Sequence, residues 1–121
     1  MQAQINSETR NAHGKPYTFV PLTGCFDEHS LADFSAIIDS LLESHHAYLV
    51  FDLGELDLMS SHAVGYFENT HRKLAAAEKR MAFVNANAEI RETLEFIGLA
   101  QLIAIFDRED KFVEAIGSGE I

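Results

Sequence analysis

The chain has 121 residues, of which 47% are hydrophobic, so it has enough apolar material for one core but not for two. Nineteen acidic and nine basic residues give a formal net charge of -10, which disfavours binding to nucleic acid or to an anionic membrane surface. No apolar run reaches the ~18 residues that a membrane-spanning helix requires, and the first residues lack the basic start and apolar core of a signal peptide.

The N-terminal part of the chain predicts a β-hairpin followed by a helix. Residues 3–7 alternate weakly, residues 11–16 carry a turn signal, and residues 17–22 form a second strand. Pro21 cannot donate a hydrogen bond to a sheet, so we expect this strand to bulge or to have a free side there. After a loop over residues 25–29, a helix begins near Ser30, because apolar residues then recur every three or four positions at Leu31, Phe34, Ile37, Ile38, Leu41 and Leu42.

The second half of the chain alternates strands with helices. Residues 47–51 are continuously apolar, as expected of a central strand covered on both faces, and a short loop follows Asp52. The next helix opens at Ser60 or Ser61 and ends in a basic cluster at residues 79–80. The remaining predicted elements are a strand over residues 81–84, a helix over 89–97 capped by Gly98, a strand over 102–106 and a helix over 110–116.

This order of elements predicts an α/β fold. Strands that alternate with helices are joined by right-handed crossovers, so they form a mostly parallel sheet of four to five strands. The N-terminal hairpin adds an antiparallel edge, and about four helices cover the sheet. No linker, repeat or low-complexity segment divides the chain, so we expect a single domain over residues 1–121.

Histidine and cysteine offer no recognised metal site. His45 and His46 are adjacent and point in different directions, while His62 and His71 lie nine residues apart on one predicted helix. Neither spacing places two ligands on one face, so we expect no metal. Cys25 is the single cysteine, and no arginine follows it closely, as a cysteine phosphatase would require. We therefore expect Cys25 to be a small buried hydrophobic residue and the protein to lie in a reducing compartment, the cytoplasm.

Three acidic residues, Asp52, Glu55 and Asp57, stand near the carboxyl end of the predicted central strand, where open α/β sheets place ligands. A phosphate-receiver domain would also need paired acids after its first strand and a lysine after a later one. The later strand leads instead into Asn85 and Asn87. We therefore interpret the three acids as solvated loop residues.

Two serines, Ser60 and Ser61, stand at the mouth of the helix that follows. A serine hydroxyl there caps unpaired backbone amides, and the positive end of the helix dipole also favours a phosphoryl group. The pair alone fits either simple capping or a phosphorylation switch. His62 directly follows Ser61 and no Gly-x-Ser-x-Gly elbow surrounds them, so a serine hydrolase is not indicated.

Several segments resemble the STAS family, and within it the bacterial anti-sigma factor antagonists. Leu22-Thr23-Gly24-Cys25-Phe26-Asp27 resembles the family's Leu-x-Gly-x-Leu-Asp loop, and Leu49-Val50-Phe51-Asp52-Leu53 resembles its central strand. Phe96-Ile97-Gly98-Leu99 resembles the Gly-Leu turn before the last strand, and residues 112–116 resemble the terminal helix. The resemblance covers nearly the whole chain and implies a single STAS-like domain, with no catalysis and no cofactor.

The family's Asp-Ser-Ser-Gly motif falls on Ser60-Ser61-His62-Ala63, so its phosphoacceptor falls on Ser61, with Ser60 as the alternative acceptor. This chain departs from the motif at the other three positions. The resemblance implies that the unphosphorylated protein binds an anti-sigma factor or related switch serine kinase, and that phosphorylation of Ser61 releases this partner. A serine phosphatase of the metal-dependent type would restore the binding form.

The same resemblance implies a partner-binding surface, whose predicted residues are Phe26, Asp27, Glu28, His29, Ser60, Ser61, His62, Val64, Gly65 and Asn85. The oligomeric state is left open between a monomer and a weak homodimer. One alternative is a STAS domain that serves as a non-phosphorylated interaction or scaffold module in a sensory or transport complex, which the altered motif favours. Another is an enzyme or small-ligand binder that uses the acids near Asp57 together with His62.

Overall fold

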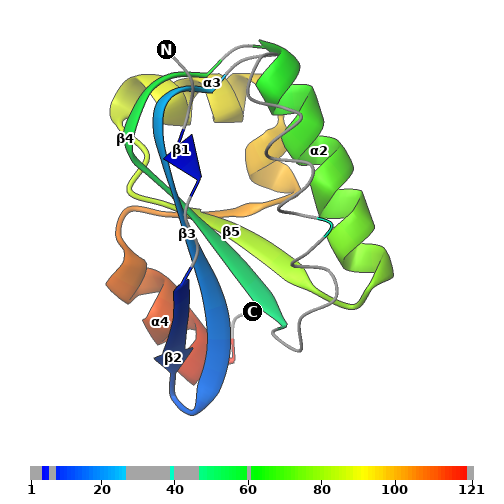
Figure 1. Cartoon of the computed structure of the whole chain (residues 1–121), viewed down its shortest axis with the longest axis vertical. Coiled ribbons are helices and arrows are strands. Elements are labelled where there is room, and N and C mark those ends of the chain that lie inside the picture. The colour runs from blue at the N-terminus through cyan, green and yellow to red at the C-terminus, as the bar shows by residue number, and fades with distance from the viewer. Residues whose placement is uncertain (1–3, 6–7, 27–38, 40–46, 60, 120–121) are drawn as a thin grey trace.

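The computed structural model describes residues 4–5, 8–26, 39, 47–59 and 61–119. Its centre is one mixed sheet with the strand order β1-β3-β4-β5-β6, and β2 also pairs with β3 (Figure 1). The strands β3 (Lys15–Phe26), β4 (Tyr48–Met59), β5 (Arg80–Val84) and β6 (Ala104–Phe106) are parallel to one another. The predicted α/β fold, with a mostly parallel sheet and an antiparallel edge, is therefore confirmed.

The antiparallel edge is built by β1 (Gln4–Ile5) and β2 (Glu8–Ala12), which both pair with β3. β1 lies within the strand predicted over residues 3–7, but the sequence missed β2, and the tight hairpin joins β2 rather than β1 to β3. His13 and Gly14 have φ values of 52° and 81°, so they form a turn of two left-handed residues. This turn is shorter than the one predicted over residues 11–16. The β3–β4 register shifts just after Pro21, as predicted for a proline in this strand.

The strands β3 and β4 are longer than predicted. β4 continues past Asp52 to Met59, and β3 runs to Phe26, where the sequence predicted loops. Beyond Asp52, β4 has lost β5 as a neighbour and pairs with β3 alone, up to the pair Phe26 and Met59. Each strand thus supplies the hydrogen-bond partners that keep the other extended. In Figure 1 the two strands curve together above the rest of the sheet before the chain enters α2.

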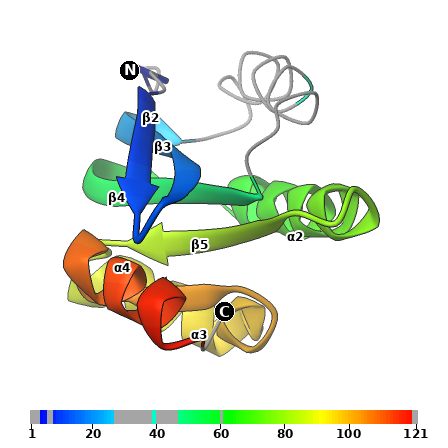
Figure 2. The same cartoon turned by 90° about the horizontal axis from the view of Figure 1, so that it is seen from below.

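Helices cover both faces of the sheet. The helices α2 (Ser61–Ala76) and α3 (Ala88–Ile97), followed by the short η2 (Leu99–Gln101), lie on one face, and α4 (Glu109–Ser118) lies on the other (Figure 2). Because successive strand residues point to opposite faces, the sheet contributes to two cores. The α2–α3 core contains Val20, Leu22, Leu49, Phe51, Leu53, Phe67, Leu74, Phe83, Ile90 and Leu94, and the α4 core contains Tyr17, Phe19, Val50, Ala82, Val84, Phe112 and Ile116.

Most helix boundaries agree with the sequence within two residues. α3 begins after Asn87, whose side chain accepts a hydrogen bond from Ile90 N at 2.8 Å, and it ends at Gly98 with φ 86° as predicted. α2 ends at Ala76, earlier than the predicted basic cluster, because Arg80 instead begins β5. The helix predicted from Ser30 lies outside the described residues, apart from Asp39, which is helical.

Candidate partner-binding surface at the start of α2

The paired ends of β3 and β4 bring two of the predicted surface residues close together in the backbone. Phe26, the last residue of β3, pairs with Met59, and Ser61 begins α2 two residues after Met59. The prediction that this helix opens at Ser60 or Ser61 is thus correct. Asp27, Glu28, His29 and Ser60 lie outside the described residues, and the side chains of Phe26, Ser61, His62 and Val64 also lie outside the description.

α2 is anchored to the sheet from its second turn onward. Phe67 is completely buried, and its ring centroid lies 5.8 Å from that of Phe51 and 5.0 Å from that of Phe83, with edge-to-face geometry in both pairs. Leu74, two turns further along, is also completely buried. Gly65 lies on the exposed side of the helix, and a Cβ built there would meet no atom within 4 Å. The buried face fixes the helix, while the face that carries Gly65 is open.

The charge at the start of α2 differs from that of the other described α-helices. The first turn of α3 contains Glu89, and that of α4 contains Glu109 and Asp110, whereas the first turn of α2 contains no acidic residue. Carboxylates in a first turn compensate the positive end of the helix dipole. At Ser61 that positive end has no carboxylate within its own turn, so the helix dipole there favours a negative group.

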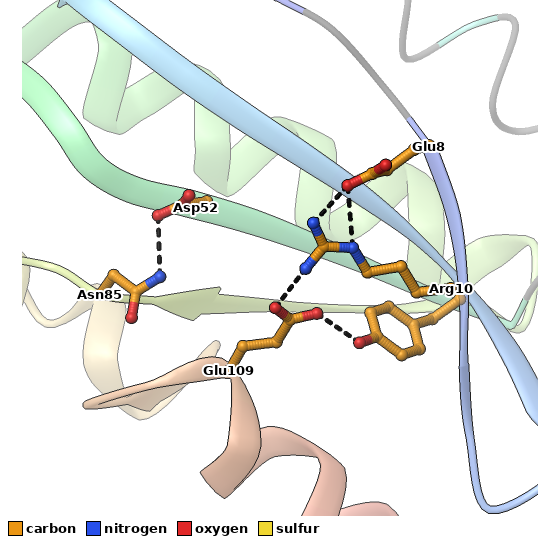
Figure 3. Close-up of polar contacts among 6 residues, drawn as sticks. Glu8, Arg10, Asp52, Asn85 and Glu109 are labelled. Atoms are coloured by element: carbon orange, nitrogen blue, oxygen red, sulfur yellow. Dashed lines mark hydrogen bonds and ion pairs between the residues drawn. The ribbon is translucent and has the colours of Figure 1, made fainter.

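Asn85 directly follows the end of β5. It follows Val84, which pairs with Asp52 across β4 and β5, and its Nδ2 donates a hydrogen bond to Asp52 Oδ1 at 3.0 Å (Figure 3). The amide of Gly54 donates to the same oxygen at 2.9 Å. Asp52 and Met59 are seven positions apart on β4, which corresponds to at most about 23 Å of extended strand. Through its hydrogen bond, Asn85 is held at the carboxyl end of β5, against Asp52 of β4.

The contacts of Asp52 correct our interpretation of the three acids. Asp52 is half-buried within β4 and accepts two hydrogen bonds, so it is not a solvated loop residue. Glu55 is exposed but belongs to the same strand, and Asp57 is a strand residue whose side chain is not described. A Cβ on Gly54 would approach Asp52 Oδ1 to 3.1 Å and Asn85 Cβ to 3.3 Å. Asp52 thus links β4 to the residue that follows β5, at the end of the β4–β5 pairing.

A second polar cluster, which sequence analysis did not identify, fastens α4 to the edge hairpin. Arg10 pairs with Glu8 and Glu109, and the Tyr17 hydroxyl donates to Glu109, as Figure 3 shows for the labelled residues. Arg10 Cζ also lies 3.8 Å from the centre of the Phe19 ring. Burial and the hydrogen bond to Glu109 raise the pKa of the Tyr17 hydroxyl well above its usual range. No signal in the sequence connects residues so far apart.

Within the described part of the chain, no group of three or more His, Cys, Asp or Glu side chains could hold a metal ion. None of the helices described there is long and apolar enough to cross a membrane. The start of α2 thus follows directly on the paired ends of β3 and β4, and Gly65 in its second turn is exposed.

The STAS domain family model matches residues 4–112 of the chain. No curated protein sequence matches the chain significantly. Four solved structures illustrate the structural similarity. The anti-sigma factor antagonist SpoIIAA in its unphosphorylated form is 19% identical, with a TM-score of 0.70 over 93% of this chain and 97% of that chain. Bacillus SpoIIAA in its phosphorylated form is also 19% identical, with a TM-score of 0.69 over 93% of this chain and 99% of that chain.

An anti-sigma factor antagonist from Mycobacterium paratuberculosis is 18% identical, with a TM-score of 0.73 over 93% of each chain. The STAS domain of a SulP transporter from Vibrio cholerae is 15% identical, with a TM-score of 0.67 over 85% of this chain and 80% of that chain. At these identities the similarity to solved structures concerns the fold.

Proposed function

The chain belongs to the STAS domain family, and on this premise we propose that it is an anti-sigma factor antagonist controlled by phosphorylation. In its unphosphorylated form it binds an anti-sigma factor or related switch serine kinase. Phosphorylation of Ser61 by that kinase releases the partner, and a serine phosphatase of the metal-dependent type restores binding. The similarity of the fold to SpoIIAA, for which both an unphosphorylated and a phosphorylated structure exist, supports this proposal.

The observation that carries the proposal is the position of Ser61 as the first residue of α2, beside the end of β3. A phosphoryl group adds about −1.5 to −2 charges at neutral pH. The dipole of α2 favours that charge, and the first turn of the helix holds no acidic residue to oppose it. The helix therefore tolerates the phosphate, whereas a partner docked on the same helix end would have to bury it.

The energetic effect on the partner is large. Burying a charge that lacks a compensating partner commonly costs several kcal/mol at an interface, and every ~1.4 kcal/mol changes affinity about tenfold. We propose that the surface comprises Phe26, Asp27, Glu28 and His29 together with the start of α2, namely Ser60, Ser61, His62, Val64 and Gly65. We include Asn85, which follows β5 and is held against Asp52, in the same surface.

The proposal includes no catalysis by this chain and no cofactor. The protein acts in the cytoplasm as one domain over residues 1–121, as a monomer or a weak homodimer, and its partners are proteins rather than nucleic acid or membrane. Its excess of acidic residues favours a partner whose contact face is basic. Ser60 remains the alternative acceptor, because it directly precedes Ser61.

The test uses the protein produced in its own cells, in growing and in stressed cultures. Intact mass and peptide sequencing should reveal one phosphate on Ser61 whose occupancy changes with condition. Ser61→Ala should abolish the phosphate and capture the partner under both conditions, while the matched control Ser60→Ala should keep the phosphate on Ser61 and its dependence on condition. A phosphate that persists in Ser61→Ala but disappears in Ser60→Ala would move the acceptor to Ser60.

The second candidate function is a STAS interaction or scaffold module that is not phosphorylated. Serine, histidine and alanine at positions 60, 62 and 63 replace the residues of the family motif that surround the acceptor, and this departure favours the module. The similarity of the fold to the STAS domain of a SulP transporter is compatible with it. This alternative predicts no phosphate under any condition, and partner capture that is the same for Ser61→Ala, Ser61→Glu and the natural protein.

A further inference from the structure

A groove of about 550 Å³ lies at the amino edge of the sheet, beyond the opposite end of α2 from Ser61. It is bordered by the last part of α2, by the first residues of β4 and β5, and by residues of β6 and α4. In Figure 1 this region lies where α2 turns back into β5. Cavities of this volume are in the range that proteins use for small molecules, about 300–1,000 Å³.

The floor of the groove is apolar. Ala82 and Phe112, which belong to the α4 core, line it, and each of them is at least 98% buried. Leu102 forms part of the wall and is 50% exposed. An apolar body placed in the groove would remove Leu102 from water and gain free energy from its burial.

The rim of the groove is cationic, although the chain as a whole has a net charge of -10. Lys79 and Arg80 stand there side by side, with Glu78 as the acidic residue of the lining. Backbone hydrogen bonds fix both positions, because Lys79 N donates to Leu74 O at 2.7 Å and Arg80 N donates to Ala47 O at 2.8 Å. The cations are therefore presented by a rigid backbone.

Arg80 differs from the other four arginines of the chain. Arg10, Arg72, Arg91 and Arg108 each pair with at least one carboxylate. Within the part of the chain that the structure describes, no carboxylate pairs with the Arg80 guanidinium, and this residue is exposed on the groove rim. A guanidinium binds a carboxylate through two parallel N–H···O bonds, which gives both strength and orientation.

We propose that this groove binds a small organic carboxylate with an apolar body, such as a medium-chain aliphatic acid. The apolar body lies on Ala82 and Phe112 against Leu102, and the carboxylate accepts hydrogen bonds from Arg80 at the rim. Lys79 adds positive charge nearby. This site is distinct from the start of α2, and the proposal does not depend on phosphorylation of Ser61.

The test is a titration of the full chain with decanoate, below its micelle concentration, followed through the ¹H–¹⁵N shifts of the backbone amides. Decanoate should shift the amides of Arg80, Leu102 and Ala104 in a saturable way. Decyltrimethylammonium, which has the same tail and the opposite charge, should leave them unchanged. Arg80→Gln should weaken decanoate binding at least ~10-fold, because a charge-assisted hydrogen bond is lost.

Lys73→Gln is the matched control, because it removes one positive charge from an exposed position on α2 that does not line the groove. It should change the affinity less than ~2-fold, since an exposed charge at a distance is screened by salt. Equal losses in Arg80→Gln and Lys73→Gln, equal shifts from both amphiphiles, or no saturable shift from decanoate would overturn the proposal. Shifts that appear only with phosphatidylglycerol vesicles would assign the groove to a membrane surface and would also overturn it.

Discussion

Replacing Asn85 tests the polar contact that joins β4 to the end of β5. Asn85 has a φ of 63°, in the left-handed region that asparagine tolerates better than most residues. Its side chain donates to Asp52 Oδ1 at 3.0 Å. Asn85→Ala therefore removes a hydrogen bond worth about 1 kcal/mol at this half-buried site and adds about 1–2 kcal/mol of left-handed strain. We expect a total destabilisation of about 2–3 kcal/mol.

Asn85→Gly separates these two costs. Glycine accepts the left-handed conformation without strain, so this variant loses the hydrogen bond and about 0.5 kcal/mol from the greater freedom of its unfolded chain. We expect Asn85→Gly to be destabilised by about 1.5 kcal/mol, less than Asn85→Ala. Urea unfolding resolves the difference, since 1 kcal/mol shifts the midpoint by about 0.5 M when m is about 2 kcal/mol per M. If Asn85→Ala is as stable as Asn85→Gly, the argument from backbone strain is refuted.

Three further predictions follow from burial, helix propensity and ionisation. Gly65→Ala should stabilise the protein by about 0.5–1 kcal/mol in urea unfolding, because α2 gains helix propensity and the new methyl group meets no neighbour. The same variant should weaken partner capture. A loss of stability would contradict the first expectation. Phe112→Ala should lower the free energy of unfolding by about 3–5 kcal/mol, whereas the same change at Phe96, which is 94% exposed, should lower it by less than about 0.5 kcal/mol. Similar losses at both sites would contradict the burial of Phe112. The pKa of Tyr17 is raised in the folded state, so its protonated hydroxyl stabilises the fold fully below about pH 10. At higher pH the free energy of unfolding falls by about 1.4 kcal/mol per pH unit, because only the unfolded chain then releases this proton. Urea unfolding across this pH range should show a weaker decline in Tyr17→Phe than in the natural protein, and parallel profiles would refute the assignment.

Features that depend on neighbouring residues could be predicted from the sequence. Gly98 ends α3 in the left-handed conformation, and Ser61 begins α2, because capping depends on a few consecutive backbone groups. The register shift after Pro21 likewise follows from the missing amide proton of proline. The alternation of strands and helices was sufficient for the parallel sheet, since few topologies satisfy the crossover rule.

Features that depend on distant segments could not be predicted in this way. Glycine and acidic residues after Asp52 indicated a loop, but β3 lies alongside and keeps this part of β4 extended. The environment of Asp52 is set by Asn85, 33 residues later, and that of Arg10 by Glu109, 99 residues later. The groove near Arg80 combines two helices with three strands, and no periodic pattern in one segment reports such an arrangement.

The buried face of α2 also bears on how a phosphate at Ser61 would act. Phe67 and Leu74 are completely buried on this helix, so its position is determined by the core rather than by its first residue. A phosphate at the first residue of α2 would therefore leave the fold in place. The chain already has a net charge of -10, but charges more than about 8–10 Å apart are largely screened at physiological salt. A phosphate inside the contact lies within that distance of every partner group it meets, so its local charge, rather than the net charge of the chain, would decide whether the partner binds.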